Sequence, residues 1–532
     1  GGRAGAALDL YIAAERLPMW LAVFPEATLD PAIEAPRADS YARDHALVEI
    51  VRGRLDALGP TTAASLAGTL GVPVEDIDAA LLALEAEGTA MRGRFTESAA
   101  GESPEWCNRR LLARIHRYTV NRLRREIEPV EQRDFLRFLF EWQRVAPEAR
   151  VEGTDAVAGI VAQLEGFEAP AAAWETEILP ARVNEYDPAS LDELSRAGRV
   201  VWTRIAPLQA SGGRAPAPVR TTPIVLAQRR NLAAWNALAA ERDNVQLGSG
   251  ARKVFAYLDA HGASFFDDIV EGCGLLRAQL EEALAELVAN GLAVADSFAG
   301  LRALLVPSER RRPAAGRRRP RRTALFGIED AGRWSLTRRR PTMPQGEPVQ
   351  AATSERSPTR SPGAPAPAQR ATPDVVEHVA RGLLRRYGVV FWHLVAREAR
   401  WLPPWRELLR CYRRLEARGE IRGGRFVAGL SGEQFAAPEA IGSLREIRRR
   451  ERDGMLIGLS GADPLNLVGV LSPGARVPSL TGNRVLYRDG IPIAVLVAGE
   501  VRYLEPLSGP DQWAARDALL RRHVPASLQL LG

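Results

Sequence analysis

The sequence is poor in cysteine and histidine, which narrows the kinds of site that it can hold. Its three cysteines, Cys107, Cys273 and Cys411, are far apart in the 532 residues and form no C-x-x-C pair. A disulfide framework and a structural zinc site are therefore not expected, and a reducing cytoplasm is the natural setting. The six histidines are scattered and none lies in a metal-binding motif, so we predict no metal in this chain.

Motifs for nucleotide hydrolysis and membrane insertion are missing as well. There is no G-x-x-x-x-G-K-[ST] phosphate loop, and Lys253, the only lysine, lies outside any glycine-rich stretch. The chain is therefore not expected to hydrolyse ATP by the P-loop route. Apolar runs are too short to cross a bilayer and no signal-peptide pattern is present, which predicts no membrane partner. Because the first residue is Gly1 and not methionine, we expect a piece of a longer protein.

Length and composition predict a globular chain of two to five domains. Hydrophobic residues make up 46% of the sequence and charged residues 26%, which is typical of folded domains. The net charge of +6 is a mild basic bias. Any function as a polyanion-binding surface therefore depends on where the arginines gather.

Residues 106–145 contain two helical patterns that are separated at Pro129. In the first, apolar residues recur at intervals of three and four between Leu111 and Leu123, and arginines occupy much of the remaining surface. This pattern predicts an amphipathic helix with a basic polar face. The second pattern, from Phe135 to Trp142, is apolar over a wide arc and predicts a buried partner helix. A merely solvated charged face is the alternative interpretation of the arginines.

One short pattern occurs three times without a gap, at 80–95, 283–298 and 411–426. Each copy has a leucine four residues before a glycine, and then an alternating segment that ends on phenylalanine. The glycine fits a helix C-cap in the left-handed conformation, and the leucine fits its core contact one turn earlier. A weaker copy lies at Leu194/Gly198. The three clear pairs are Leu84/Gly88, Leu287/Gly291 and Leu415/Gly419.

Three helices followed by a hairpin are typical of a winged helix, and residues 41–100 show this pattern most clearly. Helices are expected there at 45–58, from the cap residues Thr61 and Thr62 to Gly71, and at 74–87. Near the end of the chain, strand patterns at 455–460, 465–471, 483–490, 491–499 and 500–507 predict a small barrel, closed by a helix at 512–522. The predicted fold is mainly α with α+β modules: tandem winged-helix domains followed by a small C-terminal β-barrel.

The predicted domain boundaries follow from these patterns and from shifts in composition. A helix at 8–17 that stops at Pro18 belongs to a docking segment, and an Arg/Pro-rich stretch after residue 306 predicts a mobile linker. In chain order we predict a helical docking segment at 1–40, a winged helix at 41–100, a basic helical region with a further winged-helix module at 101–246, a winged helix at 247–306, the linker at 307–373, a winged helix at 374–450, and the small barrel with its terminal helix at 451–532.

Arginines gather on the first and last modules and on the basic helix, where they could contact phosphates. Trp405 could stack on an exposed base, although a core position is the alternative for an aromatic residue at helical spacing. The copy at 283–298 has almost no basic residue and is predicted to pack against protein. The predicted DNA-binding residues are Arg92, Arg94, Arg109, Arg110, Arg114, Arg117, Arg122, Arg124, Arg125, Arg406, Arg410, Arg413, Arg414, Arg422, Arg425 and Trp405.

Several longer segments are distinctive: RRLLARIHRYTVNRLRREIEPV with FLRFLFEWQRV, QLEGFEAPAAAWETEILPARV, RYGVV with RGGRFVAGLSGEQFA, and DPLNLVGVL with NRVLYRDGIPIAVL. Together they resemble the C-terminal region of Lhr, the large helicase-related DNA helicases of bacteria. The resemblance extends over nearly all of the chain. It implies membership in an ATP-dependent polypeptide associated with DNA repair, whose motor domains lie upstream.

The resemblance also implies partners and a setting. ATP and Mg would be needed only by the upstream motor, and no cofactor is expected in this chain. The implied partners are DNA, the helicase motor of the same polypeptide, and further copies of the chain in a homo-oligomer such as a tetramer. The implied location is the cytoplasm, in association with the nucleoid.

The C-terminal region of that family is similar to the AlkZ-like DNA glycosylases, which contain tandem winged helices and a small barrel. Those enzymes use a glutamine–apolar–glutamine motif that this sequence lacks, and Gln143 after Trp142 is the nearest equivalent. Three hypotheses follow. The chain is a DNA-binding and assembly region of a repair helicase, or a glycosylase that acts on a flipped, damaged base, or a protein-interaction and oligomerisation scaffold.

Overall fold

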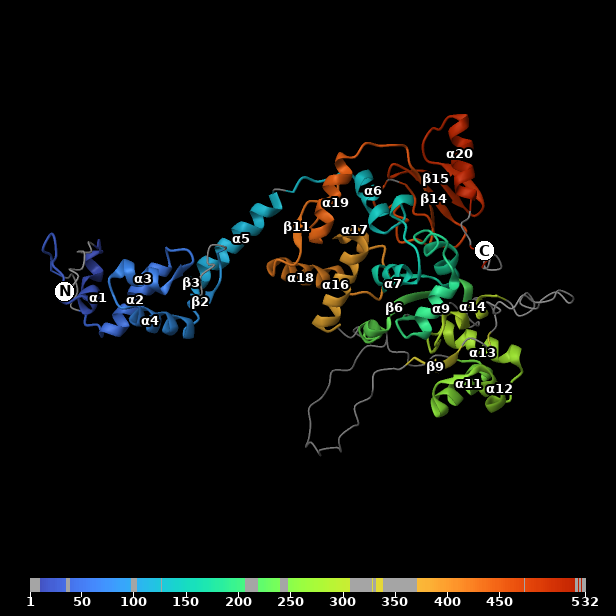
Figure 1. The fold of residues 1–532 in the computed structure, drawn as a ribbon, viewed down its shortest axis with the longest axis horizontal. Helices are drawn as coiled ribbons and strands as arrows, with labels where there is room; N and C mark the ends of the chain where they lie inside the picture. The colour runs from blue at the N-terminus through green and yellow to red at the C-terminus, as the bar shows by residue number, and fades with distance from the viewer. Residues whose placement is uncertain are drawn as a thin grey trace, which may run out of the picture. The chain divides into compact units, whose positions relative to one another are not determined.

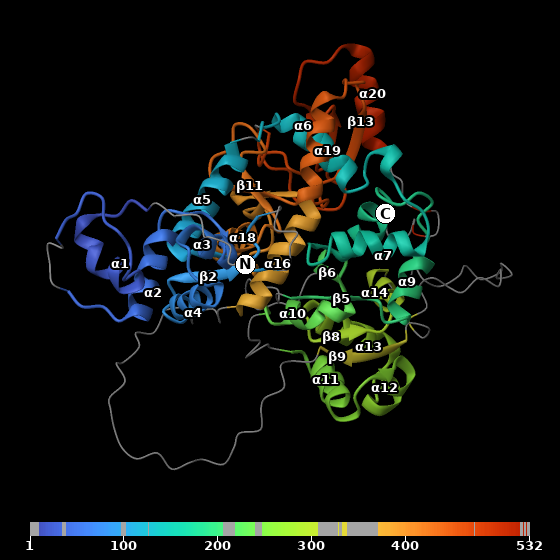
Figure 2. The ribbon, with the colours of Figure 1, turned by 60° about the vertical axis from the view of Figure 1, so that its left-hand side comes forward.

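The computed structural model describes residues 10–34, 39–96, 103–125, 127–205, 219–239, 247–306, 328, 332–337, 371–472, 474–521, 525 and 528. By its internal contacts the chain divides into two compact units, 1–126 and 127–532. Figures 1 and 2 label the helices and strands of each unit. Within the described ranges, no helix combines the length and the apolar character needed to cross a membrane.

The first unit contains module 1, a winged helix formed by residues 43–108. Its helices are α2 (Arg43–Leu55), α3 (Ala63–Leu70) and α4 (Val74–Ala86), and its strands are β1 (Thr61–Thr62), β2 (Ala90–Gly93) and β3 (Glu105–Asn108). β3 lies between β1 and β2 and pairs antiparallel with both. The Thr62 hydroxyl accepts a hydrogen bond from the Ser65 N–H and caps α3, which ends at Gly71, as the sequence predicts.

The segment before module 1 differs from the sequence-based prediction of a helix at 8–17. The structure has a 3-10 turn, η1 (Ala14–Arg16), followed by α1 (Leu17–Val23). Pro18 thus lies in the first turn of a helix and does not end one, because the N–H that proline lacks would have no helical partner there. Met19 and Val23 are buried in the apolar core of module 1, so this segment packs on the winged helix.

Three more winged helices lie in the second unit. Module 2 contains α7 (Thr154–Gln163), β4 (Glu168–Pro170), α8 (Ala171–Ala173), the π-helical turn η3 (Trp174–Ile178), α9 (Pro188–Arg196), β5 (Val200–Thr203) and β6 (Pro223–Gln228). Module 3 contains α11 (Ser249–His261), β7 (Ser264–Phe265), α12 (Phe266–Cys273), α13 (Arg277–Ala289), β8 (Ala293–Ala295) and β9 (Arg333–Leu336). Module 4 contains α16 (Pro373–Tyr387), β10 (Val389–Phe391), α17 (Trp392–Val395), α18 (Trp405–Ala417), β11 (Arg422–Gly424) and β12 (Gln434–Ala436).

All four modules share one strand order. The sheets read β1-β3-β2, β4-β6-β5, β7-β9-β8 and β10-β12-β11, so the last strand of each module lies in the middle. In module 3 that last strand, β9, comes from the segment 307–373 that the sequence predicts to be a linker. Trp334 of β9 is fully buried, which explains why this short piece joins the sheet. Most of the segment around it lies outside the described residues.

The predicted leucine–glycine caps are confirmed in all four modules. Each glycine has a positive φ, between 64° and 77°, and each leucine is buried. The N–H after the glycine donates to the leucine carbonyl at 2.8–3.0 Å, as in a Schellman motif. The four donor–acceptor pairs are Thr89 to Leu84, Arg199 to Leu194, Leu292 to Leu287 and Glu420 to Leu415. The weaker copy at Leu194 therefore has the same local structure as the clear ones.

The C-terminal part of the second unit is a four-stranded antiparallel sheet covered by a helix. The strands are β13 (Leu456–Ser460), β14 (Arg484–Arg488), β15 (Ile491–Val497) and β16 (Glu500–Tyr503), and the helix is α20 (Gly509–Leu520). The strand predicted at 465–471 is absent, because that segment folds into tight turns with buried leucines. In the described residues β13 and β16 remain the two edges of the sheet, so closure into a barrel is not confirmed.

The second unit is connected internally by buried ion pairs. Arg182 of module 2 donates to both carboxylate oxygens of Asp463, at 2.6 and 3.0 Å, and to Gln143 at 2.9 Å. Arg302 in α14 (Phe298–Leu305) donates to Glu175 and Asp192 of module 2 at 2.7–3.1 Å. These fully buried guanidiniums link segments that are more than a hundred residues apart in sequence.

Candidate nucleic-acid interface

Helix α18 has one apolar face and one basic face, and it lies beside α16 in module 4 (Figure 1). Leu408, Cys411 and Tyr412 are fully buried in the module core. The opposite face carries four exposed arginines at i, i+4, i+7 and i+8, which is the spacing of one helical stripe. They are Arg406, Arg410, Arg413 and Arg414. This is the third helix of a winged helix, the element that enters the major groove in helix-turn-helix proteins.

The four guanidiniums of this stripe differ in their partners. Arg413 forms a bidentate pair with Glu433, at 3.0 and 3.1 Å, and is already neutralised. Arg414 acts on the buried Cys411 thiol, whose pKa is raised by burial and lowered in part by this arginine. Arg406 and Arg410 make no ion pair or hydrogen bond within the described ranges. These two charges are therefore free to contact an external anion.

The wing of module 4 extends the basic surface. Arg422 and Arg425 are exposed and have no partner in the part of the chain that the structure describes. The backbone beneath them is held rigidly, since the buried Gln434 side chain bonds to the N–H groups of Phe426 and Val427 at 2.8 Å. Arginines on α18 and on the wing thus belong to one preformed module.

Trp405 is predicted from the sequence either to stack on an exposed base or to lie in the core, and its position is intermediate. It is partly buried against the core, and its ring centroid lies 6.1 Å from that of Tyr412. Tyr412 is fully buried and its hydroxyl donates to the Ala380 carbonyl at 3.1 Å. Tyr412 is therefore a core residue, and only part of the Trp405 ring can meet a ligand.

In the first unit, the predicted basic helix is confirmed as α5 (Arg109–Arg125), which follows β3 directly (Figure 1). Four of its arginines, Arg109, Arg110, Arg114 and Arg117, are exposed and make no ion pair among the described residues. Arg122 and Arg124 have interactions within the chain, and the side chain of Arg125 lies outside the described residues. Over its first two turns α5 therefore presents arginines that no carboxylate of the described residues neutralises.

The hairpin of module 1 contributes the remaining predicted arginines. Arg94 is exposed. Arg92 is also exposed, with its guanidinium 5.6 Å from the Trp106 ring centroid and 3.7 Å from Glu85. The hairpin is pinned at its base by Glu105, which accepts hydrogen bonds from the Phe95 and Thr96 N–H groups and the Thr96 hydroxyl.

The predicted partner helix of α5 has a different role. Residues 132–142 form α6, which is part of the second unit and packs against α19 (Pro438–Arg449) and module 4. Phe135 lies 5.8 Å from Phe391, and Phe140 lies 5.3 Å from Tyr487. The apolar pattern of this helix correctly predicts burial, but its neighbours come from segments hundreds of residues away.

The copy at 283–298 packs against protein, as the sequence predicts. Ala293 and Ala295 are buried, and modules 2 and 3 share one apolar core. The phenylalanine that ends this copy, Phe298, starts helix α14 and does not complete a wing.

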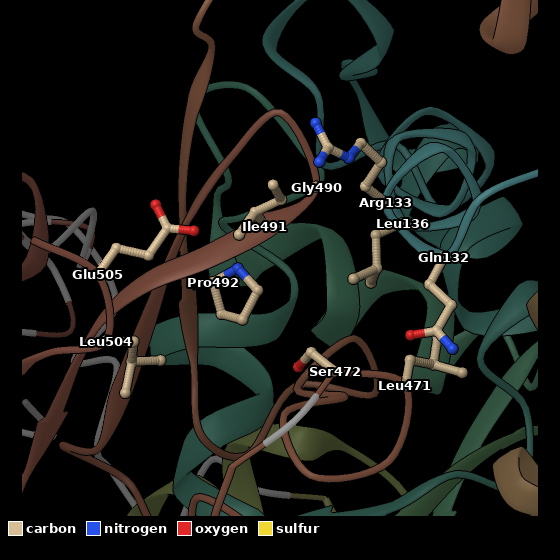
Figure 3. Close-up of a pocket in the computed structure, with 10 residues that line it drawn as sticks. All are labelled: Gln132, Arg133, Leu136, Leu471, Ser472, Gly490, Ile491, Pro492, Leu504 and Glu505. Atoms are coloured by element: carbon tan, nitrogen blue, oxygen red, sulfur yellow. The ribbon is translucent and has the colours of Figure 1, made fainter. Parts of the chain in front are cut away.

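A cavity of about 370 Å³ lies between α6 and the C-terminal sheet (Figure 3). Its walls include Leu136, Leu471, Ile491, Pro492 and Leu504, and polar groups come from Gln132, Arg133, Ser472 and Glu505. Figure 3 shows these side chains arranged around a common space. Sequence reasoning missed this cavity because its residues come from four separate segments, none of which forms a motif.

Gln143 does not line that cavity. It is fully buried, its amide nitrogen donates to the Arg386 carbonyl at 2.8 Å, and its amide oxygen accepts from Arg182 at 2.9 Å. A side chain with both ends occupied in the core cannot reach a nucleobase. The interpretation of Gln143 as a catalytic glutamine is therefore not supported.

Comparisons with known proteins agree with this architecture. Family models of the large helicase-related protein, winged-helix domain, match residues 130–224 and 368–456. The chain is 28% identical over 457 residues to "Lhr helicase/ probable uracil glycosylase" of Mycolicibacterium smegmatis, and 28% identical over 530 residues to "Lhr helicase/uracil glycosylase" of Escherichia coli. These alignments cover 82% and 91% of this chain, but only 27% and 30% of the two relatives.

Among solved structures, the Streptomyces sahachiroi DNA glycosylase AlkZ is similar over 75% of this chain and 97% of its own, with 12% identity and a TM-score of 0.40. A likeness of this degree carries no functional argument. The domain matches and the two long alignments confirm the predicted resemblance. The chain is similar to the winged-helix, C-terminal region of the large helicase-related proteins, Lhr.

Proposed function

We propose that this chain is the DNA-binding region of an ATP-dependent DNA repair helicase whose motor is part of the same polypeptide. The observation that carries the proposal is the exposed face of α18, where Arg406 and Arg410 have no partner within the described ranges. The names of both relatives include a helicase, and this chain corresponds to less than a third of either.

Phosphate contacts are the interaction that this surface suits. A guanidinium that already forms a bidentate pair must break it before it can bind phosphate, whereas an unpaired, exposed one needs only to lose water. Arg406, Arg410, Arg422 and Arg425 meet the second condition in module 4. Arg109, Arg110, Arg114 and Arg117 meet it in α5. Duplex binding is therefore expected to be governed by phosphates and to weaken steeply with salt.

The test is a binding series on duplex, single-stranded and forked DNA at several salt concentrations. Binding that weakens with salt supports the proposal. A chain that binds none of the three at low salt would show that the arginine surface has another purpose, such as protein contacts. Assembly into homo-oligomers stays a prediction, and light scattering on the same samples measures it.

A second candidate function is excision of uracil from DNA, which the printed names of both relatives include. The cavity beside α6 favours it, because its volume suits a small ligand and it combines apolar walls with an amide, a hydroxyl and a carboxylate. Glu505 is the only carboxylate among the residues that line it. In this candidate, Glu505 stabilises the developing positive charge on the sugar or activates a water molecule.

An oligonucleotide with one deoxyuridine tests this second function, since an abasic product breaks in alkali. Glu505→Gln should abolish breakage. Glu500→Gln is the matched control, because Glu500 is an exposed carboxylate on the neighbouring strand β16. Activity that survives in Glu505→Gln would remove this cavity from consideration.

A further inference from the structure

A second cavity, of about 390 Å³, lies in the second unit where the end of α6 meets α7 and α16. It has an aromatic residue, two arginines and an amide around a floor of small and aliphatic side chains. No carboxylate is among its lining residues. They include Trp142, Arg144, Ala156, Gly159, Gln163 and Arg385.

Arg144 has a backbone conformation that its side chain does not favour. Its φ is 62°, in the left-handed region that glycine adopts without strain. This conformation is that of a helix C-cap, because Arg144 follows the end of α6 and the Val145 N–H donates to the Phe140 carbonyl at 2.7 Å. The Arg144 guanidinium is exposed and has no partner in the part of the chain that is described. Glycine is the usual residue at such a position, so the cap does not need the arginine side chain, which is left available to a ligand.

Arg385 also lines the cavity, and its backbone is bonded to the aromatic residue. Its carbonyl accepts the Trp142 indole N–H at 3.0 Å, and the Trp142 carbonyl accepts the Gln163 amide at 2.7 Å. The Arg385 guanidinium lies 3.5 Å from the Ala162 carbonyl and 3.9 Å from the buried Glu165, and its side chain is 41% exposed. The indole and Arg385 are thus fixed by contacts within the fold, and Arg144 lines the same cavity without a partner among the described residues.

Small residues of α7 line one side of the cavity. A Cβ atom added at Gly159 would meet no atom within 4 Å, so the space above this helix is open. Gly159 is exposed, and Ala156 is partly exposed one turn earlier. The volume falls in the range of small-molecule sites, roughly 300–1,000 Å³.

We propose that this cavity binds one nucleotide of a single DNA strand, with the phosphate between Arg144 and Arg385 and the base against Trp142 and α7. Two guanidiniums without a lining carboxylate suit an anion, and an indole beside small apolar residues suits a flat heteroaromatic ring. The inference rests on the proposed DNA-binding function. It adds a single-strand contact on a different surface from α18.

Three variants test it with labelled oligothymidylate, a blunt duplex and thymidine monophosphate as ligands. Arg144→Gly removes the charge and also relieves the backbone strain, so it should fold at least as well as the parent. Gly159→Met fills the cavity from a helical position, and Gly442→Met, an exposed and equally open glycine of α19, is its control.

Arg144→Gly and Gly159→Met should bind oligothymidylate about five- to tenfold more weakly than the parent, while duplex binding and Gly442→Met are unchanged. The salt slope for single strands should become shallower by roughly 0.7 in Arg144→Gly. If Arg144→Gly and Gly159→Met bind oligothymidylate as tightly as the parent, the inference is overturned and the proposed function stands. If the parent binds neither oligothymidylate nor the duplex, the inference and the proposed function are both overturned. Thymidine monophosphate bound as tightly as the oligonucleotide would assign the cavity to free nucleotides and overturn the strand contact.

Discussion

Replacing Arg406 and Arg410 by alanine should make duplex binding weaker and less sensitive to salt. Both side chains are exposed on α18 and have no partner in the described residues, so their removal disturbs no ion pair of the fold. Alanine is a good helix former, which keeps α18 intact. The change therefore reports on contacts with DNA and not on stability.

The expected magnitude follows from counterion release. Each phosphate contact with duplex DNA contributes about 0.9 to the slope of log affinity against log salt. Two lost contacts should therefore make the slope shallower by about 1.8. A rise from about 50 to about 200 mM salt is fourfold, which lowers affinity by about 3.5-fold for each contact and about 12-fold for two. The parent should lose about 12-fold more affinity over this range than the double variant does.

Fluorescence anisotropy on a short labelled duplex measures both slopes. The charge-matched control is Arg445→Ala with Arg516→Ala, which removes two exposed, unpaired arginines from α19 and α20, among the described residues but outside module 4. The same slope in the parent, the Arg406/Arg410 variant and this control would refute the assignment of α18 to phosphate contacts. A slope that changes equally in both double variants would show only a net-charge effect.

Three further predictions concern the fold that holds these surfaces. Arg182→Met leaves Asp463 buried without its partner and should lower the free energy of unfolding by about 3–5 kcal/mol, measured by urea titration. In Gly419→Ala the added Cβ atom meets no neighbouring atom, but the backbone φ of 77° is unfavourable for alanine. This strain should lower the free energy of unfolding by about 1–2 kcal/mol, which is measured as a lower melting temperature. Hydrogen bonds, first that of the Thr96 hydroxyl, lower the pKa of Glu105. The ionised Glu105 carboxylate thus gives its full stabilisation above its ordinary pKa of 4.5, and this stabilisation is lost as the pH falls through the folded pKa. Amide exchange in β3 should show this loss, and Glu105→Gln should abolish the pH dependence.

The sequence predicts the structure correctly where the stabilising contacts join residues that are close together in the chain. The leucine–glycine spacing predicts the C-cap in all four modules, because a left-handed glycine and a core contact one turn earlier are decided within six residues. The threonine cap of α3 and the alternating strands β14 and β15 were predictable for the same reason. The prediction of a helix at 8–17 is wrong because Pro18 does not end a helix. It lies in the first turn of α1, a position that proline also favours.

The sequence by itself thus determined the repeated winged-helix modules, the basic character of α5 and α18, and the resemblance to Lhr. Tertiary structure alone decided which arginines are free, since Arg413 finds Glu433 across the wing while Arg406 and Arg410 find no partner in the described residues. It also decided that Gln143 is a core residue, that β9 completes module 3, and where the two cavities lie. Each of these depends on contacts between segments far apart in sequence, and no local period or spacing encodes such contacts.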